Sequence, residues 1–182
     1  MKFIEGIEEL ISHFVDFFWG IGFYGWQIST CYALYISTFY SWSYSIIYAL
    51  VFILFGWFNH IILKDYINDP RPADSIRFLA SEHFNKRSNG MPSGHAQQTA
   101  FSLTLAYLLT GEAFYESWLL FGITVLQRYV YKNHTIPQLF AGGVLGLCLG
   151  YAVFYSFKYW ERYRAKVEKK VNKFASEVTY TA

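Results

Sequence analysis

The strongest constraint on the fold is a stretch from Phe17 to Leu63 that contains no Asp, Glu, Lys or Arg. His60 is its one ionisable interruption apart from tyrosines and Cys31. A transmembrane helix needs about 20 apolar residues, so the stretch is long enough to cross a bilayer twice. The chain is 54% hydrophobic and 15% charged, whereas soluble domains carry about 25% charged residues. These properties predict an integral membrane protein and argue against a soluble core.

Residues 1–16 have a different pattern. Apolar side chains recur at helical spacing from Phe3 to Val15, and the polar face carries Lys2, Glu5, Glu8, Glu9, Ser12 and Asp16. This periodicity predicts an amphipathic helix. A helix of this kind lies in the membrane interface more readily than it crosses the bilayer.

The other apolar runs predict an all-α, polytopic membrane helix bundle with five transmembrane helices. Ser41-Trp42-Ser43 and Asn133-His134 read as tight connections between them. The expected crossings span residues 17–39, 44–63, 93–110, 117–131 and 136–157. The chain 1–182 is then a single domain, with a bundle at 17–157 and a basic, helical tail at 158–182.

Gly142, Gly146 and Gly150 lie four residues apart on the last expected crossing. Small residues at this spacing let a second helix approach closely. We therefore assign these glycines to packing and to no chemistry.

The polar connection from Lys64 to Met91 is unusual, because loops of about 28 residues are normally functional or partly helical. Asp69-Pro70-Arg71-Pro72 is a firm helix breaker. A short helix covering a site is expected further along the connection, with one face formed by Ile76, Leu79, Ala80 and His83 and with Phe78 and Phe84 beside it.

Counting crossings places the polar residues on one membrane face, if the first helix lies flat. They stand at the end of the second crossing, the start of the third, and the junction of the fourth and fifth: Lys64, the long connection, His95, Arg128 and His134. The tail carries seven Lys and Arg against three Glu and emerges on the opposite face. The positive-inside tendency puts the tail in the cytoplasm and the polar cluster outside.

This cluster has the chemistry of a phosphate site. It combines cations with the hydroxyl, histidine and helix-terminal amides of Pro92-Ser93-Gly94-His95, and anions are favoured at a helix N-terminus. Each part also has a simpler interpretation, because Pro-Ser-Gly-His makes an ordinary helix cap and boundary cations snorkel to the interface. His13, His60 and His83 are scattered and lack metal-ligand spacing, so no metal site is predicted.

Three spaced motifs resemble the type 2 phosphatidic acid phosphatase superfamily. The first is Lys64, six residues, then Arg71-Pro72, and the second is Pro-Ser-Gly-His at 92–95. The third is Arg128, five residues, then His134, three residues, then position 138. Each motif stands beside an expected membrane span, and the match covers residues 64–138.

The resemblance implies a mechanism. His134 would attack phosphorus and form a phosphohistidine, while His95 would protonate the leaving oxygen and then activate water. The phosphoryl oxygens would be held by Lys64, Arg71, Ser93, Gly94 and Arg128. The resemblance implies no cofactor, no metal and no nucleic-acid partner.

Two positions depart from the family pattern. Gln127 stands where Ser is usual, and Gln138 stands where Asp is usual. The Asp would orient the nucleophilic imidazole and stabilise its charged form, whereas Gln138 offers an amide oxygen without the charge. Asp69, Asp74 or Glu82 could instead supply a carboxylate from the long connection.

The implied function is a lipid phosphatase of the membrane bilayer, placed in a bacterial inner membrane with its site on the periplasmic face. Candidate substrates are phosphatidylglycerophosphate, lipid A 1-phosphate, phosphatidate and a polyprenyl diphosphate. An alternative, motivated by Gln138, is a lipid-phosphate-binding relative with weakened chemistry. The charge-free spans argue against a soluble, vanadate-holding haloperoxidase-like relative.

Overall fold

The computed structural model describes residues 2–76, 78, 89–112 and 114–179, and within these ranges the chain is helical without a strand. The helices are α1 (Lys2–Phe23), α2 (Gly25–Tyr40), α3 (Trp42–Phe58), the π-helix η1 (Asn59–Leu63), α4 (Lys64–Ile67), α5 (Gly94–Thr110), α6 (Phe114–Val130) and α7 (Ile136–Thr179). The all-α prediction is confirmed.

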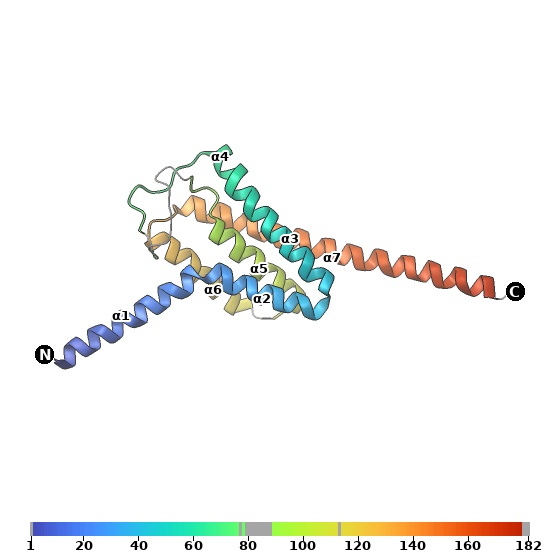
Figure 1. Ribbon diagram of the computed structural model, residues 1–182, viewed down its shortest axis with the longest axis horizontal. Helices are drawn as coiled ribbons and strands as arrows, with labels where there is room; N and C mark the ends of the chain where they lie inside the picture. The colour runs from blue at the N-terminus through green and yellow to red at the C-terminus, as the bar shows by residue number, and fades with distance from the viewer. Residues whose placement is uncertain (1, 77, 79–88, 113, 180–182) are drawn as a thin grey trace.

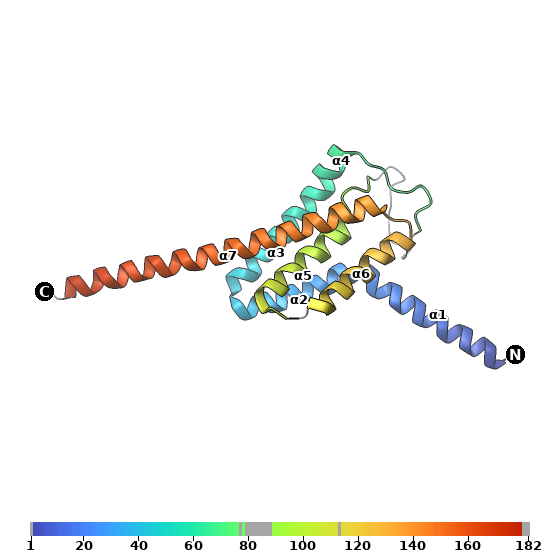
Figure 2. The same ribbon diagram turned by 180° about the vertical axis from the view of Figure 1, so that it is seen from behind.

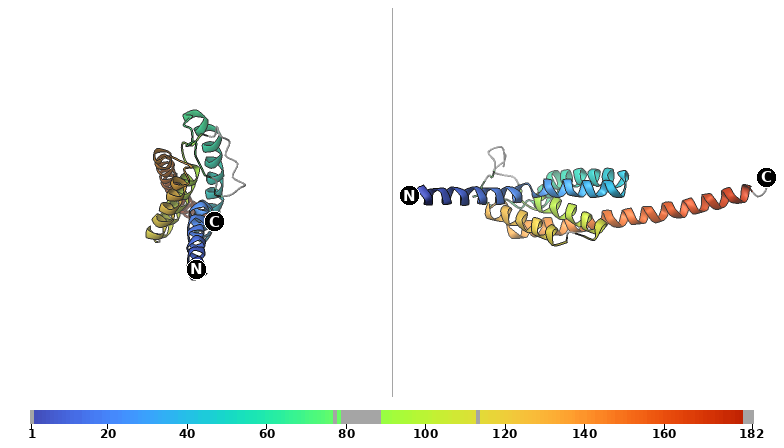
Figure 3. Two further views of the ribbon diagram at one scale, coloured as in Figure 1. Left: turned by 90° about the vertical axis from the view of Figure 1, so that its left-hand side faces the viewer. Right: turned by 90° about the horizontal axis from the view of Figure 1, so that it is seen from below.

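Helices α2 to α6 and the first half of α7 form a bundle around α5 (Figures 1 and 2). α5 packs against α7, α2 and α6 and is buried along most of its length. The N-terminal part of α1 and the second half of α7 project from the bundle, so the two termini lie at opposite ends of the long axis (Figure 3). The ends of α4 and α6 and the starts of α5 and α7 gather at one end of the bundle.

The close packing of α5 on α7 depends on the glycines of α7. A Cβ at Gly142 would overlap the Ser93 carbonyl oxygen, and one at Gly146 would overlap the Gln97 carbonyl oxygen. A Cβ at Gly150 would meet the Thr104 side chain. The predicted role of these three glycines in helix packing is confirmed.

The first expected crossing, residues 17–39, is wrong as a single helix. α1 continues to Phe23, Tyr24 separates the helices, and α2 begins at Gly25. The glycines on either side explain the break, because a Cβ at Gly22 would overlap Gln127 and one at Gly25 would overlap Thr124. α1 and α2 therefore bend where they pack tightly against α6. Since no charged residue marks this bend, the charge pattern did not reveal it.

The second crossing also ends later than expected. α3, η1 and α4 run without interruption from Trp42 to Ile67, so Lys64 lies inside the helix and does not end it. Asn68, in the left-handed conformation with φ of 52°, forms the C-cap. The turn expected at 41–43 is a single extended residue, Ser41, whose side chain caps α3 by accepting from the Ser43 amide at 3.2 Å.

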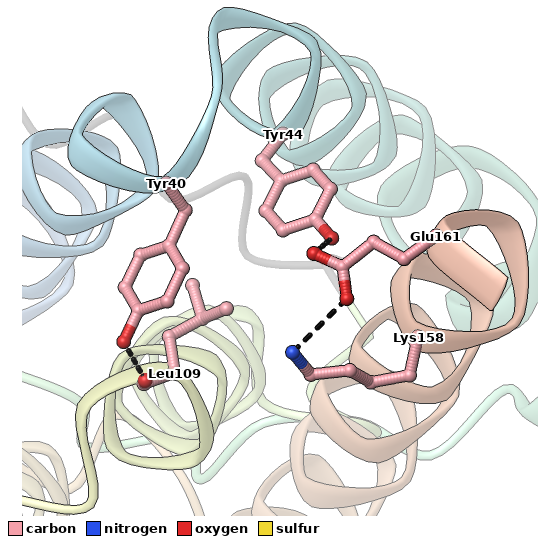
Figure 4. Close-up of polar contacts among 5 residues, drawn as sticks. All are labelled: Tyr40, Tyr44, Leu109, Lys158 and Glu161. Carbon is pink, nitrogen blue, oxygen red and sulfur yellow. Dashed lines mark hydrogen bonds and ion pairs between the residues drawn. The ribbon is translucent and has the colours of Figure 1, made fainter. Parts of the chain in front are cut away.

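The end of the bundle away from α4 is held by polar contacts shown in Figure 4. The Tyr40 hydroxyl donates to the Leu109 carbonyl oxygen at the end of α5. The Tyr44 hydroxyl donates to Glu161 on α7, which also pairs with Lys158 at 3.1 Å. The Tyr44 ring stacks on Phe157 with centroids 3.9 Å apart. Together these contacts fix the α2–α3 turn to α5 and α7.

Burial in this bundle differs from the pattern of a soluble protein, because large polar side chains are buried beside an apolar core. Among the described residues, the largest fully buried side chains include Arg128, His134, Gln97, Gln127, Gln138, Asn59 and Asn133. Large apolar side chains instead face outward on α2, α3, α6 and α7, for example Phe39, Ile53, Trp57, Leu119 and Phe140. The buried polar side chains are therefore surrounded by an apolar surface.

Within the described residues, two helical stretches are long and apolar enough to cross a membrane by length and composition, Trp42–Ile67 and Ile136–Ala175. α2, α5 and α6 have only 16 or 17 residues each, about 25 Å at 1.5 Å per residue. The five-crossing count therefore stays a prediction.

Candidate active site

A cavity of about 250 Å³ lies at the end of the bundle among α2, η1, α4, the start of α5 and the connection before α7, and it contains most of the predicted site residues. Lys64, Arg71, Gly94, His95 and His134 line it, together with Trp26, Gly56, Asn59, His60, Gln97 and Gln98. The three motifs, far apart in the sequence, thus supply the walls of one cavity. Two histidines and two cations facing the same space can bind and transfer a phosphoryl group.

The Pro-Ser-Gly-His motif begins α5, as the sequence predicted. The Ser93 hydroxyl accepts from the Ala96 amide at 3.5 Å and so caps the helix. Ser93 is fully buried and does not line the cavity, whereas Gly94 does. A Cβ at Gly94 would meet no atom within 4 Å, so the backbone at the helix start is open to a ligand.

His95 lies against aromatic rings, with ring centroids 5.9 Å from Phe23 and 6.1 Å from Trp26. Its Nε2 is buried and has no hydrogen-bond partner among the described residues. A ring nitrogen that faces the cavity without a protein partner is free to exchange a proton with a ligand.

The π-helix η1 explains how Lys64 comes to face the cavity. The Lys64 amide donates to the Asn59 carbonyl oxygen, five residues earlier, which places the two side chains on one buried face. In a regular α-helix a spacing of five residues would turn Lys64 about 140° away from Asn59. The Asn59 side-chain NH₂ also donates to Gln97 Oε1 on α5. This contact fixes the turn against the helix that carries His95. π-turns of this kind occur frequently at functional sites.

His134 stands on the short connection between α6 and α7, where a tight link was expected. Lys132 adopts the left-handed conformation at this turn, with φ of 51°. The Asn133 backbone N–H donates to the Arg128 carbonyl oxygen at 2.9 Å and closes the turn. Arg128 itself is buried, with its guanidinium 5.7 Å from the centre of the Phe23 ring.

The His134 imidazole is buried, and this burial lowers its pKa well below the usual value. The positive charges of Arg71, Arg128 and Lys64 lower that pKa further, while the hydrogen bond to Gln138 opposes the shift. His134 is therefore neutral at pH 7, the protonation state that a nitrogen nucleophile requires.

Gln138 makes hydrogen bonds with both ends of its amide. Oε1 lies 3.2 Å from His134 Nδ1 and accepts from the Thr135 amide at 3.2 Å. Nε2 donates to Asp69 Oδ2 at 2.7 Å and to the Pro70 carbonyl oxygen at 3.0 Å. Because Asp69 and Pro70 offer acceptors, the NH₂ must face them and the oxygen must face His134. The proton of His134 then lies on Nδ1, which leaves the Nε2 lone pair for chemistry.

Gln138 also belongs to a capping box at the start of α7. The Gln138 backbone N–H donates to the Thr135 hydroxyl at 3.5 Å, and Gln138 Oε1 accepts from the Thr135 backbone N–H in return. Thr135, two residues, then Gln138 is the sequence signature of this motif. This signal was present in the sequence but was not among the predicted site features.

The described ends of the long connection cover Gln138. Pro70 and Asn89 form an isolated antiparallel bridge, and the Gly90 amide donates to the Asp69 carbonyl oxygen at 2.7 Å. A Cβ at Gly90 would overlap the Gln138 amide. The absence of a side chain at Gly90 therefore lets the connection close directly over the amide that contacts His134.

Of the three carboxylates that the sequence offered as a substitute for the usual Asp, Asp69 reaches the site through Gln138. Asp74 is exposed and pairs with Lys132, which lowers the pKa of the Asp74 carboxyl, mainly through the hydrogen bond from Lys132. Glu82 lies outside the described residues, as do Leu79, Ala80, His83 and Phe84 of the expected short helix. Phe78 is described and stacks on Phe23, with centroids 4.9 Å apart.

Asn59, Gln97 and Trp26 were not predicted as site residues, although all three line the cavity. No motif marks them, and their positions depend on the π-turn and on the packing of α2 against α5. Within the described residues, no group of three or more His, Cys, Asp or Glu side chains could hold a metal ion.

The fold and the cavity define an all-helical protein with a buried cationic site that holds one histidine at the start of α5 and a second on the connection before α7. A family model described as the PAP2 superfamily matches residues 41–162, and the chain belongs to this superfamily. Membership implies phosphatase activity on phosphate esters. A search of curated proteins returned no match, and a search of solved structures also returned none.

Proposed function

We propose that this protein is a metal-independent membrane phosphatase that removes a phosphate from a lipid monoester or diphosphate. The observation that carries the proposal is the cavity in which His134, His95, Lys64 and Arg71 face one space. The candidate lipids are phosphatidylglycerophosphate, lipid A 1-phosphate, phosphatidate and a polyprenyl diphosphate.

In the proposed reaction, the Nε2 lone pair of His134 forms a bond to phosphorus while the bond from phosphorus to the lipid oxygen breaks. His95 gives its proton to that oxygen, and Gln138 keeps the remaining imidazole proton on Nδ1. His95 then removes a proton from water, and the resulting nucleophile releases phosphate and regenerates neutral His134. Lys64, Arg71, Arg128 and the Gly94 amide stabilise the phosphoryl oxygens.

The apolar outer surface of the bundle supports a membrane location. Large apolar side chains face outward on four helices, while the amides and the Arg128 guanidinium are buried, an arrangement that suits hydrocarbon as the solvent. We propose one domain with five crossings, an interfacial segment at 1–16, and a cytoplasmic tail from Lys158. The catalytic cavity then opens on the outer face, which is the periplasmic face of a bacterial inner membrane.

A phosphate-release assay on a panel of these four lipids tests the proposal. The parent protein should release phosphate from at least one lipid, and His134→Ala should abolish the release. His13→Ala is the matched control, because His13 is exposed on α1, away from the cavity. After a short reaction with a labelled lipid, the label should be bound to the parent protein through an acid-labile, alkali-stable bond. Full activity of His134→Ala would overturn the mechanism.

The second candidate is a lipid-phosphate-binding protein with weakened chemistry, and Gln138 is the observation that favours it. This candidate requires that vesicles containing the panel lipids bind the parent and His134→Ala equally and that neither protein releases phosphate. The contact between Gln138 and Asp69 favours the enzyme, because it brings a carboxylate near the position where the family has one.

A further inference from the structure

Asp69 is connected to the candidate nucleophile by an unbroken chain of hydrogen bonds. Its Oδ2 accepts from Gln138 Nε2 at 2.7 Å, and Gln138 Oε1 lies 3.2 Å from His134 Nδ1. The amide thus lies between a carboxylate and an imidazole, with its dipole pointing its oxygen at the imidazole proton. A negative charge behind the NH₂ strengthens the acceptor at the other end of the amide.

The neighbours of Gln138 hold this chain in one arrangement. Gln138 is fully buried, and the Pro70 carbonyl oxygen is a second acceptor beside its NH₂. Gly90 packs directly over the Gln138 side-chain amide. The Gly90 backbone N–H donates to the Asp69 carbonyl oxygen. A flipped amide would place its oxygen against the Asp69 carboxylate and the Pro70 carbonyl, so the flipped arrangement is excluded by repulsion.

From this geometry we infer that Asp69 is a positioning residue that acts on His134 through the Gln138 amide and supplies the negative charge that Gln138 lacks. The inference rests on the proposed function, in which His134 acquires positive charge as it bonds to phosphorus. The Asp69 carboxylate then opposes that charge at the distance of one bridging amide.

The effect of Asp69 is measurable because, among the described residues, the other groups that act on the charge of His134 are positive or become so on protonation. These groups come from four different segments: Lys64 on α4, Arg71 on the connection, His95 on α5 and Arg128 on α6. Removal of the opposing Asp69 charge should lower the pKa of His134 further. The acid limb of kcat/KM, which reports protonation of the nucleophile in the free enzyme, should therefore move to lower pH.

The test compares Asp69→Asn with Asp69→Ala in the lipid-phosphate assay. Asp69→Asn keeps an oxygen that Gln138 Nε2 can reach but removes the charge, and it should lower kcat on the order of tenfold to a hundredfold. KM should stay near the parent value, because other residues hold the phosphoryl oxygens. Asp69→Ala should lower kcat further. Asp65→Asn is the matched control, because it removes an exposed carboxylate four residues earlier and should leave activity unchanged.

A double variant asks whether Asp69 and Gln138 act as a unit. Gln138→Glu alone puts a second carboxylate against Asp69 and the Pro70 carbonyl, so activity should fall. Combining it with Asp69→Asn exchanges the amide and the carboxylate, and activity should rise at least tenfold above that of Gln138→Glu. Gel filtration and thermal melting in detergent establish which variants are folded.

Three results would count against the inference. An Asp69→Asn variant with the parent kcat and pH profile, in a protein that needs His134, would overturn it. A folded double variant no more active than Gln138→Glu would overturn it also. A loss of kcat in folded Asp69→Asn without any shift of the acid limb would reduce Asp69 to a structural residue. Activity that survives His134→Ala is a different failure, since it removes the proposed function itself.

Discussion

At the residue scale, the neutral state of His134 has a consequence for stability as well as for chemistry. The folded protein lowers the pKa of this imidazole through burial and three nearby cations, whereas the unfolded chain restores a value of about 6.5. Below that pH the unfolded chain binds more protons than the folded one, so stability must fall as the pH falls.

We therefore expect the melting temperature of the detergent-solubilised protein to drop between pH 7 and pH 5. One such group changes the free energy of unfolding by at most about 1.4 kcal/mol per pH unit. His134→Asn keeps an N–H donor for Gln138 but cannot titrate, so its melting curve should depend less on pH. His13→Gln, in exposed α1, serves as the control. Equal pH dependence in the parent and His134→Asn would contradict the prediction.

Gly90 provides a second residue-scale prediction. A Cβ at Gly90 would overlap the Gln138 amide, and that amide cannot move without releasing His134 or Asp69. Gly90→Ala should therefore lower kcat on the order of tenfold, the equivalent of about one lost hydrogen bond. Gly122→Ala is the matched control, since a Cβ there meets nothing within 4 Å. Parent-like kinetics in Gly90→Ala would show that the amide position is not critical.

The sequence predicted which residues would meet, because three motifs beside apolar spans must gather at a membrane surface. It did not reveal how Gln138 is oriented. That orientation depends on Asp69, which is 69 residues away in the chain, and on a bridge between Pro70 and Asn89. Spacing along one helix carries no information about such contacts. The capping box with Thr135 was the one local signal for the Gln138 position.

At the element scale, the packing of α7 on α5 brings the starts of the two helices together, because these starts carry Gln138 and His95 and the Ser93 amide donates to the Gln138 carbonyl oxygen at 3.0 Å. The glycine spacing predicted this contact correctly. The bend at Tyr24 and the π-turn at Asn59–Leu63 were not predicted, since each arises from a fit between helices and neither is marked by charge or a breaker.

Gly146→Ala tests the α5–α7 contact. The new Cβ would overlap the Gln97 carbonyl oxygen and approach the Phe101 amide nitrogen, and backbone atoms of a packed helix have little freedom to move. Overpacking of this kind costs about 1–3 kcal/mol, so thermal melting in detergent should show a clear loss of stability. Gly122→Ala should instead gain up to about 1 kcal/mol from helix propensity. Equal stability of the two variants would contradict this account of the packing.

At the scale of the whole molecule, the outward-facing apolar side chains and the buried polar side chains support the proposed membrane location beyond what helix length does. Hydropathy alone selects Trp42–Ile67 and Ile136–Ala175. α5 carries Gln97, Gln98, Thr99 and Ser102, and neighbouring helices satisfy Gln97 and Ser102, so a low mean hydropathy is compatible with a central position in the bundle. The sequence could not separate a crossing helix from a short helix enclosed by others.

The proposed topology is testable with a membrane-impermeant maleimide. The native Cys31 on α2 and Cys148 on α7 are free and exposed on the surface of the protein, so in intact membranes they should face lipid and remain unlabelled. After denaturation in detergent both should react, which confirms that the thiols are available. Asp65→Cys, beside the cavity, should be labelled in intact cells.

Lys166→Cys, on the exposed tail of α7, should be labelled only after the membrane is opened, because the proposed topology puts the tail with its seven basic residues in the cytoplasm. The comparison between positions 65 and 166 decides the orientation independently of activity. Labelling of Lys166→Cys in intact cells, with Asp65→Cys protected, would reverse the orientation and direct the cavity to the cytoplasm. Labelling of the native cysteines in intact membranes would contradict the membrane location, because a lipid-facing thiol is not accessible to a charged reagent.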